Sequence, residues 1–284
     1  MPGTLFLVAT PIGNLEDITL RAVRILRDEV SAIACEDTRQ TQKLLDHYGI
    51  RKPLLSYHEH NEINRAAELI EILERGEAVA LVSDAGTPLV SDPGYRVVSA
   101  AIERDIPVIP LPGPSAALAA LAASGLPMHE FLFIGFLPSK SGARRKALER
   151  IAQTGVTVVA YESPHRVMEA LREMSETFGE RRIVVGREIT KIHEEFLRGS
   201  AREIQQKLET RGPVKGEITI VIGPAEQNAA VDDPSREVAR LQEEAGLDRM
   251  EAIKTVAKRM GLPKREVYRL AEEGDSNRAS RRRE

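Results

Sequence analysis

The rest of the chain is arranged around the segment Ala80-Leu-Val-Ser83-Asp84-Ala85-Gly86-Thr87-Pro88-Leu-Val-Ser91-Asp92-Pro93-Gly94. It begins as a short apolar run and continues as a turn rich in Asp, Gly, Pro and hydroxyl side chains, a pattern typical of a buried strand followed by a ligand-binding loop. Loops at the carboxyl ends of α/β strands are the usual ligand sites. We therefore favour ligand binding for residues 83–88 and a structural role for residues 92–94, with Asp92 capping the next helix.

The composition is that of a globular protein that works inside the cell. The chain has 284 residues, of which 42% are hydrophobic, so it is long enough for two domains with cores of their own. No secretory pattern opens it, and the Ala-rich segment 116–123 is too short to span a bilayer, so we expect a cytoplasmic protein without a membrane anchor. The only cysteine, Cys35, excludes an internal disulfide and is expected to be buried.

Strand and helix patterns alternate along the first 111 residues. The expected helices cover residues 19–27, 38–48, 62–75 and 95–104, and the expected strands cover residues 5–10, 31–35, 53–57, 78–82 and 106–110. Leu20, Val23 and Leu26 are expected on one face of the first helix, and Thr38 is expected to cap the second. This alternation predicts a mostly parallel α/β sheet. Pro112-Gly113-Pro114 interrupts the pattern, and Ser115 then caps an Ala-rich helix.

A second α/β segment and a helical region follow. Further strands are expected at residues 131–136, 156–161, 182–186, 194–198 and 217–222. We therefore expect an N-terminal α/β domain over residues 1–112 and a second α/β domain over residues 113–223. Residues 224–234 have the composition of a linker, and residues 235–284 predict a small helical module that resembles a helix-turn-helix and ends in a disordered basic tail from Ser276. This module carries 13 basic and 10 acidic residues, so it is the better candidate for contact with a polyanion.

The turn after the first strand, Pro11-Ile-Gly13-Asn14, has neither the G-x-G-x-x-G pattern nor a P-loop, so nucleotide phosphate binding is not supported there. A ligand contact and a plain structural turn fit this segment equally well. Glu36, Asp37 and Arg39 follow the second strand and form either a local cap and ion pair or a group that faces the cleft.

The segment after the third strand, His58-Glu59-His60, has the residue types of a metal site. Neighbouring histidines on a loop without a further ligand set are usually not a metal site, so we expect none here.

The chain resembles the tetrapyrrole methylase superfamily of S-adenosylmethionine (SAM) enzymes, and within it a group that methylates small-subunit ribosomal RNA. The resemblance runs over nearly the whole chain and rests on residues Val8–Asn14, Glu36–Arg39, His58–Glu62, Ser83–Pro88, Pro112–Pro114, Tyr161–Ser163 and Lys215–Glu217. It implies two α/β domains with SAM folded into the cleft between them, which agrees with the missing Gly-rich fingerprint. One departure, Ser115 where a relative has Cys, exchanges one small residue for another.

The resemblance also implies a reaction, a substrate and an assembly. Members of this group methylate the ribose 2′-oxygen of a cytidine, so the expected partners are small-subunit ribosomal RNA or the small ribosomal subunit, and related folds are commonly homodimers. A SAM methyl is already activated, so the enzyme must mainly align the acceptor and exclude water, without a covalent enzyme intermediate and without a metal.

These implications select candidate residues. The expected cofactor-binding residues are Pro11, Ser83, Asp84, Ala85, Gly86, Thr87, Ser115, Ala116, Tyr161, Glu162, Gly216, Glu217 and Thr219. A carboxylate or a His would help the ribose hydroxyl to lose its proton, and the catalytic candidates are Glu36, Asp37, His58 and Glu59. The expected RNA contacts are Arg39, Lys140, Arg144, Arg145, Lys264 and Arg265.

Two other functions remain open at this point. The first is a SAM-dependent methylase of a small acceptor, such as a tetrapyrrole or a modified amino acid. The basic run at residues 140–150 and the helical module count against it, because a small acceptor does not need them. The second is a non-catalytic RNA-binding protein of ribosome assembly, against which stand the polar loops gathered at strand ends.

Overall fold

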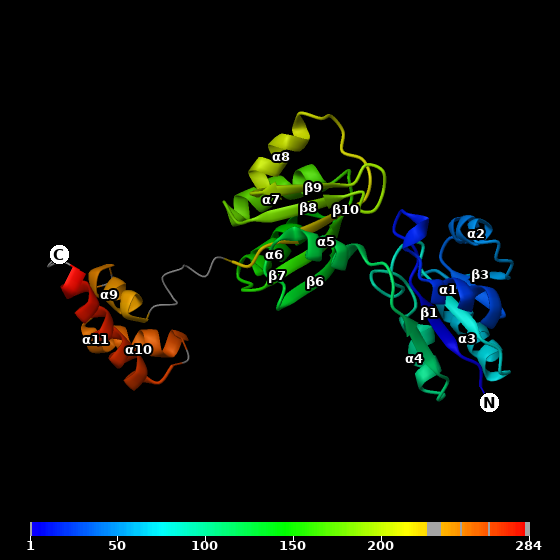
Figure 1. The fold of residues 1–284 in the computed structure, drawn as a ribbon, viewed down its shortest axis with the longest axis horizontal. Coiled ribbons are helices and arrows are strands. Elements are labelled where there is room, and N and C mark those ends of the chain that lie inside the picture. Colours follow the sequence, from blue (N-terminus) through cyan, green and yellow to red (C-terminus); the bar gives the residue numbers. More distant parts are fainter. Residues whose placement is uncertain (1, 226–233, 245, 261, 282–284) are drawn as a thin grey trace. The chain divides into compact units, whose positions relative to one another are not determined.

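The structure, a computed structural model, describes residues 2–225, 234–244, 246–260 and 262–281. The chain divides into two compact units, Met1–Gly223 and Pro224–Glu284, and each is described separately (Figure 1). Residues 226–233, most of the predicted linker, lie outside the described residues.

The first sheet consists of five parallel strands in the order β3-β2-β4-β1-β5. Its strands are β1 (Leu5–Val8), β2 (Ala32–Cys35), β3 (Leu54–Ser56), β4 (Val79–Val82) and β5 (Val108–Leu111). Strand β1 lies in register with both neighbours, since Val8 is opposite Val82 of β4 and Leu111 of β5. The loops that leave the carboxyl ends of these strands therefore meet at one edge of the sheet.

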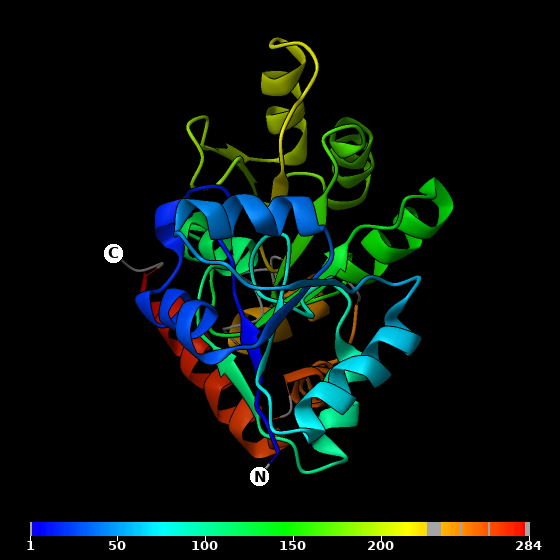
Figure 2. The same ribbon diagram turned by 90° about the vertical axis from the view of Figure 1, so that its right-hand side faces the viewer.

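Helices cover both faces of this sheet because side chains alternate along each buried strand. Phe6 and Val8 pack toward α1 (Leu20–Arg24), the wider π-helical turn Ile25–Glu29 and α2 (Thr38–His47). Leu5 and Leu81 pack toward α3 (Glu62–Glu74) and α4 (Tyr95–Ile102). Figure 2 shows α1 and α2 (blue) on one side of the strands and α3 and α4 (cyan to teal) on the other.

The second sheet is mixed, in the order β6-β7-β10-β8-β9. Its strands are β6 (Phe131–Phe136), β7 (Thr157–Glu162), β8 (Ile183–Arg187), β9 (Glu195–Gly199) and β10 (Ile218–Ile222). Only β6 and β7 run parallel, and the other neighbours are antiparallel. Strands β8 and β9 are joined by the short segment 188–194 without a helix, and such a connection cannot make a parallel pair.

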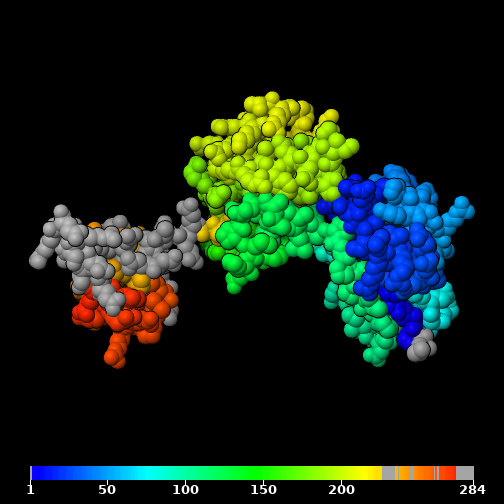
Figure 3. Space-filling model, in the orientation of Figure 1, coloured from blue at the N-terminus to red at the C-terminus, as the bar shows by residue number. Residues whose placement is uncertain are grey.

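The helices of the second sheet are distributed unequally. One face packs against α6 (Ser141–Ala152), α7 (Val167–Phe178) and α8 (Ala201–Glu209). The other face packs against α5 (Ala116–Ser124), where Ala117 and Ala120 let the helix lie close to Val159, Val184 and Val221. In Figure 3 the residues of the first sheet (blue to teal) and of the second (green to yellow) form two adjoining masses.

Three local expectations are wrong. Leu20 was expected on the buried face of its helix, but it is 90% exposed, whereas Val23 and Leu26, expected on the same face, are buried together with Ala22 and Ile25. Thr38 was expected to cap the next helix, but the capping side chain is that of Asp37, which accepts from the N–H of Arg39. Strand β10 begins at Ile218 and places Glu217 in the preceding turn.

The second unit contains three helices around a small apolar core. They are α9 (Pro234–Glu244), α10 (Arg249–Met260) and α11 (Lys264–Arg281). Val238, Ile253, Val256 and Val267 are buried between them. Helix α11 runs through residues 276–281, where the sequence predicted a disordered tail, because this segment contains no Pro or Gly to end the helix. Among the described residues no helix has the length and apolar character needed to cross a membrane.

Candidate active site

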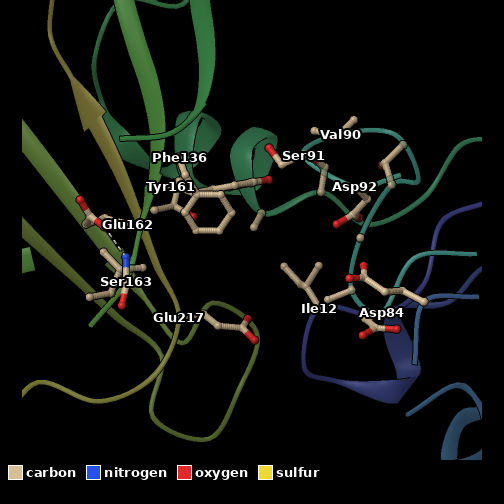
Figure 4. A pocket seen from close by; sticks show the side chains of 18 of the residues that line it. Ile12, Asp84, Val90, Ser91, Asp92, Phe136, Tyr161, Glu162, Ser163 and Glu217 are labelled. Carbon is tan, nitrogen blue, oxygen red and sulfur yellow. Dashed lines mark hydrogen bonds between the residues drawn. The ribbon is translucent and has the colours of Figure 1, made fainter. Parts of the chain in front are cut away.

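A cavity of about 460 Å³ lies in the first unit where strand-end loops of both sheets meet. Its lining residues are Ile12, Glu36, Asp84, Ala85, Gly86, Thr87, Val90, Ser91, Asp92, Ser115, Ala116, Phe136, Tyr161, Glu162, Ser163, Pro164, Glu217, Ile218 and Thr219. Figure 4 shows Ile12, Asp84 and Asp92 on one side, facing Tyr161 and Glu217 on the other. The cavity therefore gathers segments from most of the chain.

The loops after β1 and β4 are held together by backbone hydrogen bonds. The N–H of Thr10 donates to Gly86 O at 2.9 Å, and the N–H of Gly86 donates to Thr10 O at 2.9 Å. The Thr10 hydroxyl donates to Ser83 O at 2.8 Å. Gly86 has a φ of +85°, which a residue with a side chain adopts only with strain. The loop after β4 is thus fixed in shape before any ligand binds.

The next part of this loop, residues 87–94, carries backbone strain at the cavity wall. Leu89 and Ser91 have φ angles of +69° and +70°, which are uncommon for residues other than Gly. The Ser83 hydroxyl donates to the carboxylate of Asp92, and burial followed by the charge of Asp84 raises the pKa of Asp92 despite this bond. Asp92 was predicted to cap a helix, and that prediction is wrong, because Gly94 occupies the N-cap of α4 and Asp92 lines the cavity.

Glu36 is the catalytic candidate that lines the cavity. Burial raises its pKa, and the neighbouring carboxylates of Asp84, Asp92 and Glu59 raise it further. A carboxylate with a raised pKa holds a proton more readily, which suits a general base or acid.

The other catalytic candidates lie outside the cavity lining. Hydrogen bonds from Arg39 lower the pKa of Asp37 to about 2, so this carboxylate is a weak base. His58 and Glu59 follow β3; the backbone N–H of His58 donates to Asn61 Oδ1 at 2.9 Å. The His58 Nδ1 atom is buried without a hydrogen-bond partner among the described residues.

The second sheet contributes aromatic rings and a buried carboxylate. Phe136 and Tyr161 pack edge to face with ring centroids 5.5 Å apart. Glu162 is almost fully buried; it accepts from the N–H of Ser163 at 2.6 Å and pairs with Arg166 at 2.8 Å. This pair fixes the turn between β7 and α7, and with it the part of the cavity wall that Ser163 and Pro164 form.

Most of the expected cofactor-binding residues come together in the cavity. The exceptions are Pro11, Ser83 and Gly216, which do not line it; Ser83 is buried beneath the loop and bonds to Asp92. Sequence reasoning missed other lining residues, namely Ile12, Val90, Ser91, Asp92, Phe136, Ser163, Pro164 and Ile218. Three of them, Ile12, Ser163 and Ile218, directly adjoin predicted residues, so a wider window at those positions would have included them.

The residues that were expected to contact RNA are distributed over both units of the structure. Arg39, Lys140 and Arg145 are exposed on the first unit, and Lys264 and Arg265 are exposed on the second. The prediction for Arg144 is wrong, because its side chain is fully buried. Its guanidinium bonds to Glu173 at 2.7 Å and to Glu169 at 2.9 Å, so it holds α6 against α7.

The charge of the cavity is negative. Its described lining includes the carboxylates of Glu36, Asp84, Asp92, Glu162 and Glu217 and no Lys or Arg. Burial keeps the pKa of Tyr161 above its ordinary value, so its hydroxyl stays protonated at neutral pH. Among the described residues no group of three or more His, Cys, Asp or Glu is placed to hold a metal ion.

Comparison with known proteins gives the family from the sequence. The family model of the Tetrapyrrole (Corrin/Porphyrin) Methylases matches residues 4–205. The chain is 47% identical to the ribosomal RNA small subunit methyltransferase I of Halalkalibacterium halodurans, over 94% of each chain. It is 48% identical to the protein of the same name from Mesorhizobium japonicum, over 93% of this chain and 90% of that one.

Solved structures share the fold at lower sequence identity. Cobalt precorrin-4 methyltransferase covers 78% of this chain and 94% of its own with a TM-score of 0.58 and 15% identity. A uroporphyrin-III C-methyl transferase from Thermus thermophilus, complexed with S-adenyl homocysteine, covers 78% of this chain and 97% of its own with a TM-score of 0.54 and 20% identity. The predicted α/β fold is confirmed. The chain belongs to the tetrapyrrole methylase family, in the group of the ribosomal RNA small subunit methyltransferases I.

Proposed function

We propose that this protein uses SAM to methylate the ribose 2′-oxygen of a cytidine in small-subunit ribosomal RNA. The observation that carries the proposal is the acidic, preformed cavity at the strand ends, in a chain whose relatives at 47–48% identity are named for methylating that RNA. A non-catalytic assembly protein would have no reason to place Glu36, Asp84 and Asp92 together at one cavity, where burial and the charge of Asp84 raise the pKa of the other two.

The residues of the cavity fit SAM. Carboxylates such as Asp84 and Glu217 can accept from ribose hydroxyls or an ammonium group and are attracted to a sulfonium, and Ser115 and Thr87 provide further polar groups. The rings of Phe136 and Tyr161 and the apolar side chains of Ile12 and Ile218 can contact an adenine. When bound, SAM supplies a methyl group that is already activated for transfer.

Glu36 is the proposed general base. Its raised pKa lets it take the proton of a ribose hydroxyl that is held in line with the methyl. Asp84 and Asp92 keep that pKa high, so these carboxylates act on the proton transfer through Glu36 as well as on the cofactor. His58 and Glu59, also catalytic candidates, do not line the cavity, and Glu59 is close enough for its charge to raise the pKa of Glu36.

In the proposed domain organisation, the cofactor and most of the RNA are bound by different parts of the chain. Residues 1–112 and 113–223 form the two α/β domains of the cofactor site, and the helical module 235–284 holds RNA after a linker at 224–234. Exposed cations support this role: Lys254, Lys258, Lys264 and Arg265 lie on the surface of α10 and α11. On the first unit, Arg39, Lys140 and Arg145 are the proposed phosphate contacts.

We further propose a homodimer in the cytoplasm. Strand β6 is an edge strand of the second sheet, and no described strand pairs with its outer edge. Phe131 and Leu132 on this strand are 42% and 46% exposed. A long apolar edge without charges is unusual on a monomer, which supports a second copy of the chain as its partner.

The experiment that tests the proposed function measures transfer of a labelled SAM methyl to three acceptors: small ribosomal subunits, free small-subunit RNA and a tetrapyrrole precursor. We expect label in RNA, on ribose. Label only in the tetrapyrrole would support the small-acceptor alternative. SAM binding without transfer to any of the three, or no SAM binding, would contradict the proposal.

A further inference from the structure

Lys191 lies between two carboxylates beside the cavity. Its Nζ atom is 2.9 Å from Glu188 Oε1 and 3.2 Å from Glu217 Oε2. Glu217 lines the cavity with a side chain that is 68% exposed, whereas the Lys191 side chain is only 26% exposed. Lys191 itself is not among the residues that line the cavity, although its ammonium contacts one that is.

The backbone around Lys191 is strained and tightly bonded. Glu188 and Thr190 have φ angles of +51° and +68°, which a β-hairpin turn without Gly adopts only where other contacts enforce them. The N–H of Glu188 donates to Glu217 O at 3.0 Å, and the N–H of Glu217 donates to Glu188 Oε1 at 2.9 Å. The segment 188–191 and the turn at Glu217 are thus one hydrogen-bonded structure.

This structure also contacts the loop after β1, in the other half of the cavity. A Cβ atom built on Gly13 would overlap Cγ, Cδ and Cε of Lys191, so the lysine stem lies directly on the glycine. The hydroxyl of Thr190 bonds to the carboxylate of Asp17 in the same loop. Gly13 directly follows Ile12, which lines the cavity. Lys191 therefore contacts the residue next to Ile12 with its stem and contacts Glu217, on the opposite wall of the cavity, with its ammonium.

Lys191 is protonated, and so positively charged, at neutral pH. Burial alone would lower its pKa, but hydrogen bonds and charges from Glu188 and Glu217 raise it above its ordinary value. Without this ammonium, Glu188 and Glu217 would be two neighbouring carboxylates without a cation between them, and Glu217 would turn away to separate the charges. The position of the Glu217 carboxylate at the cavity wall thus depends on Lys191.

We propose that Lys191 is a positioning residue of the cofactor site, which fixes the Glu217 carboxylate at the cavity wall and joins that wall to the Gly13 turn. The proposal rests on the proposed function, because it assigns the ligand that Glu217 binds as SAM. A fixed acceptor binds its donor without first losing conformational freedom, so the expected effect is on cofactor affinity rather than on the chemical step.

The first test compares SAM binding and methyl-transfer kinetics in Lys191→Met, Lys191→Arg, Glu217→Gln and the double variant Lys191→Met/Glu217→Gln. Lys191→Met should raise the Kd and the KM for SAM about tenfold, the size of one charge-assisted hydrogen bond, and leave kcat within about twofold. Lys191→Arg should recover most of the affinity. Lys207→Met, an exposed lysine on α8, is the matched control and should match the wild type.

The double variant shows whether Lys191 acts through Glu217, because it measures whether the effects of the two substitutions on SAM binding are independent. Adding Lys191→Met to Glu217→Gln should weaken binding little further, because the carboxylate to be positioned is already absent. The proposal is overturned if Lys191→Met binds SAM within about twofold of the wild type, or if the effects of the two substitutions multiply.

A second test needs no ligand and so separates failure of this proposal from failure of the proposed function. Gly13→Ala should lower the melting temperature when Lys191 is present, because the new methyl overlaps the lysine stem. In a Lys191→Ala background the same substitution should have little effect, since the overlapping atoms are gone. Equal destabilisation in both backgrounds would show that Lys191 does not lie on Gly13, whether or not SAM binds.

Discussion

Oδ1 of Asp84 accepts a hydrogen bond from the backbone N–H of Asp37 at 3.0 Å. This bond joins the loop after β4 to the loop after β2 and brings the Asp84 carboxylate close to that of Glu36. The proximity of the two carboxylates contributes to the raised pKa of Glu36. Asp84 thus lines the proposed cofactor cavity and also raises the pKa of the proposed base, Glu36. Asp84 and Glu36 are therefore the first positions to test.

Asp84→Ala should weaken SAM binding several-fold to about a hundredfold, since a hydrogen bond to a charged group contributes about 1.5–3 kcal/mol. Asp84→Asn keeps an oxygen for the Asp37 N–H and removes the charge, so it separates the loop contact from the interaction with the ligand. Isothermal titration calorimetry gives the affinities, and Asp28→Ala, an exposed aspartate outside the cavity lining, is the control. Unchanged affinity in a folded Asp84→Ala protein would rule out the proposed site.

Glu36→Gln should lower kcat by about 10²–10⁴-fold, the range for loss of a general base, and leave SAM binding nearly unchanged. In the wild type the rate should rise with pH as Glu36 loses its proton, with an apparent pKa above the ordinary value of 4.5. This acidic limb should disappear in Glu36→Gln. Asp92→Asn is the comparison variant. Because Asp92 also has a raised pKa, this variant shows whether the acidic limb belongs to Glu36 or to Asp92. If Glu36→Gln keeps both the rate and the limb, another group is the base.

The strand ends could be predicted from sequence because parallel topology brings them together whatever the details of packing. The segments that contain Asp84, Ser115 and Tyr161, which end or follow parallel strands, were therefore found. Glu217 lines the same cavity although it precedes β10, which is antiparallel to both of its neighbours, so its place came from the resemblance to a known family. The resemblance to a known family supplied the cofactor and the reaction, which no spacing of residues could give.

The predictions that were wrong or missing concern residues whose contacts are with residues elsewhere in the sequence. Arg144 lies in a basic run that is typical of a solvated face, but its partner Glu173 is 29 positions later and draws it into the core. The role of Lys191 depends on the absence of a side chain at Gly13, in a different half of the cavity. Asp92 precedes a helix as a capping residue would, yet its partner is Ser83.

The buried pair of Arg144 and Glu173 predicts a stability effect without a direct effect on chemistry. Glu173→Ala should destabilise the protein by about 3–5 kcal/mol, because it leaves a buried guanidinium with one partner fewer. Replacing both residues with apolar ones, as in Arg144→Met/Glu173→Leu, should cost much less. Denaturant unfolding measures both, with Glu176→Ala, an exposed glutamate on the same helix, as the control. Equal destabilisation in the single and double variants would contradict this account.

The same pair predicts a dependence of stability on pH. Burial would raise the pKa of Glu173, but bonds from Arg144 and Ser141 outweigh it and lower the pKa below its ordinary value of 4.5. A carboxyl with a lowered folded-state pKa contributes stability that is present above the unfolded-state pKa and is lost as pH falls through the folded-state value. The free energy of unfolding should therefore fall below about pH 4.5, and less steeply in Glu173→Gln.

Removal of residues 224–284 should leave SAM binding intact, because both sheets lie within residues 1–223. Affinity for RNA should fall, most strongly at low salt, and the slope of log affinity against log salt should flatten by about 0.7–0.9 for each phosphate that the helical module binds. Charge reversal at Lys264 and Arg265 in the full chain is the companion variant. A truncated protein that aggregates or fails to bind SAM would show instead that the helical module is needed for folding.

Whether this protein methylates small-subunit ribosomal RNA is tested by mass mapping of that RNA from cells with and without the protein, followed by nucleoside analysis of the affected fragment. The proposed function predicts one fragment that is about 14 mass units lighter without the protein, with the missing methyl on the ribose of a cytidine, restored by the wild type and not by Glu36→Gln. A missing methyl on a base, or identical maps from both strains, would contradict it.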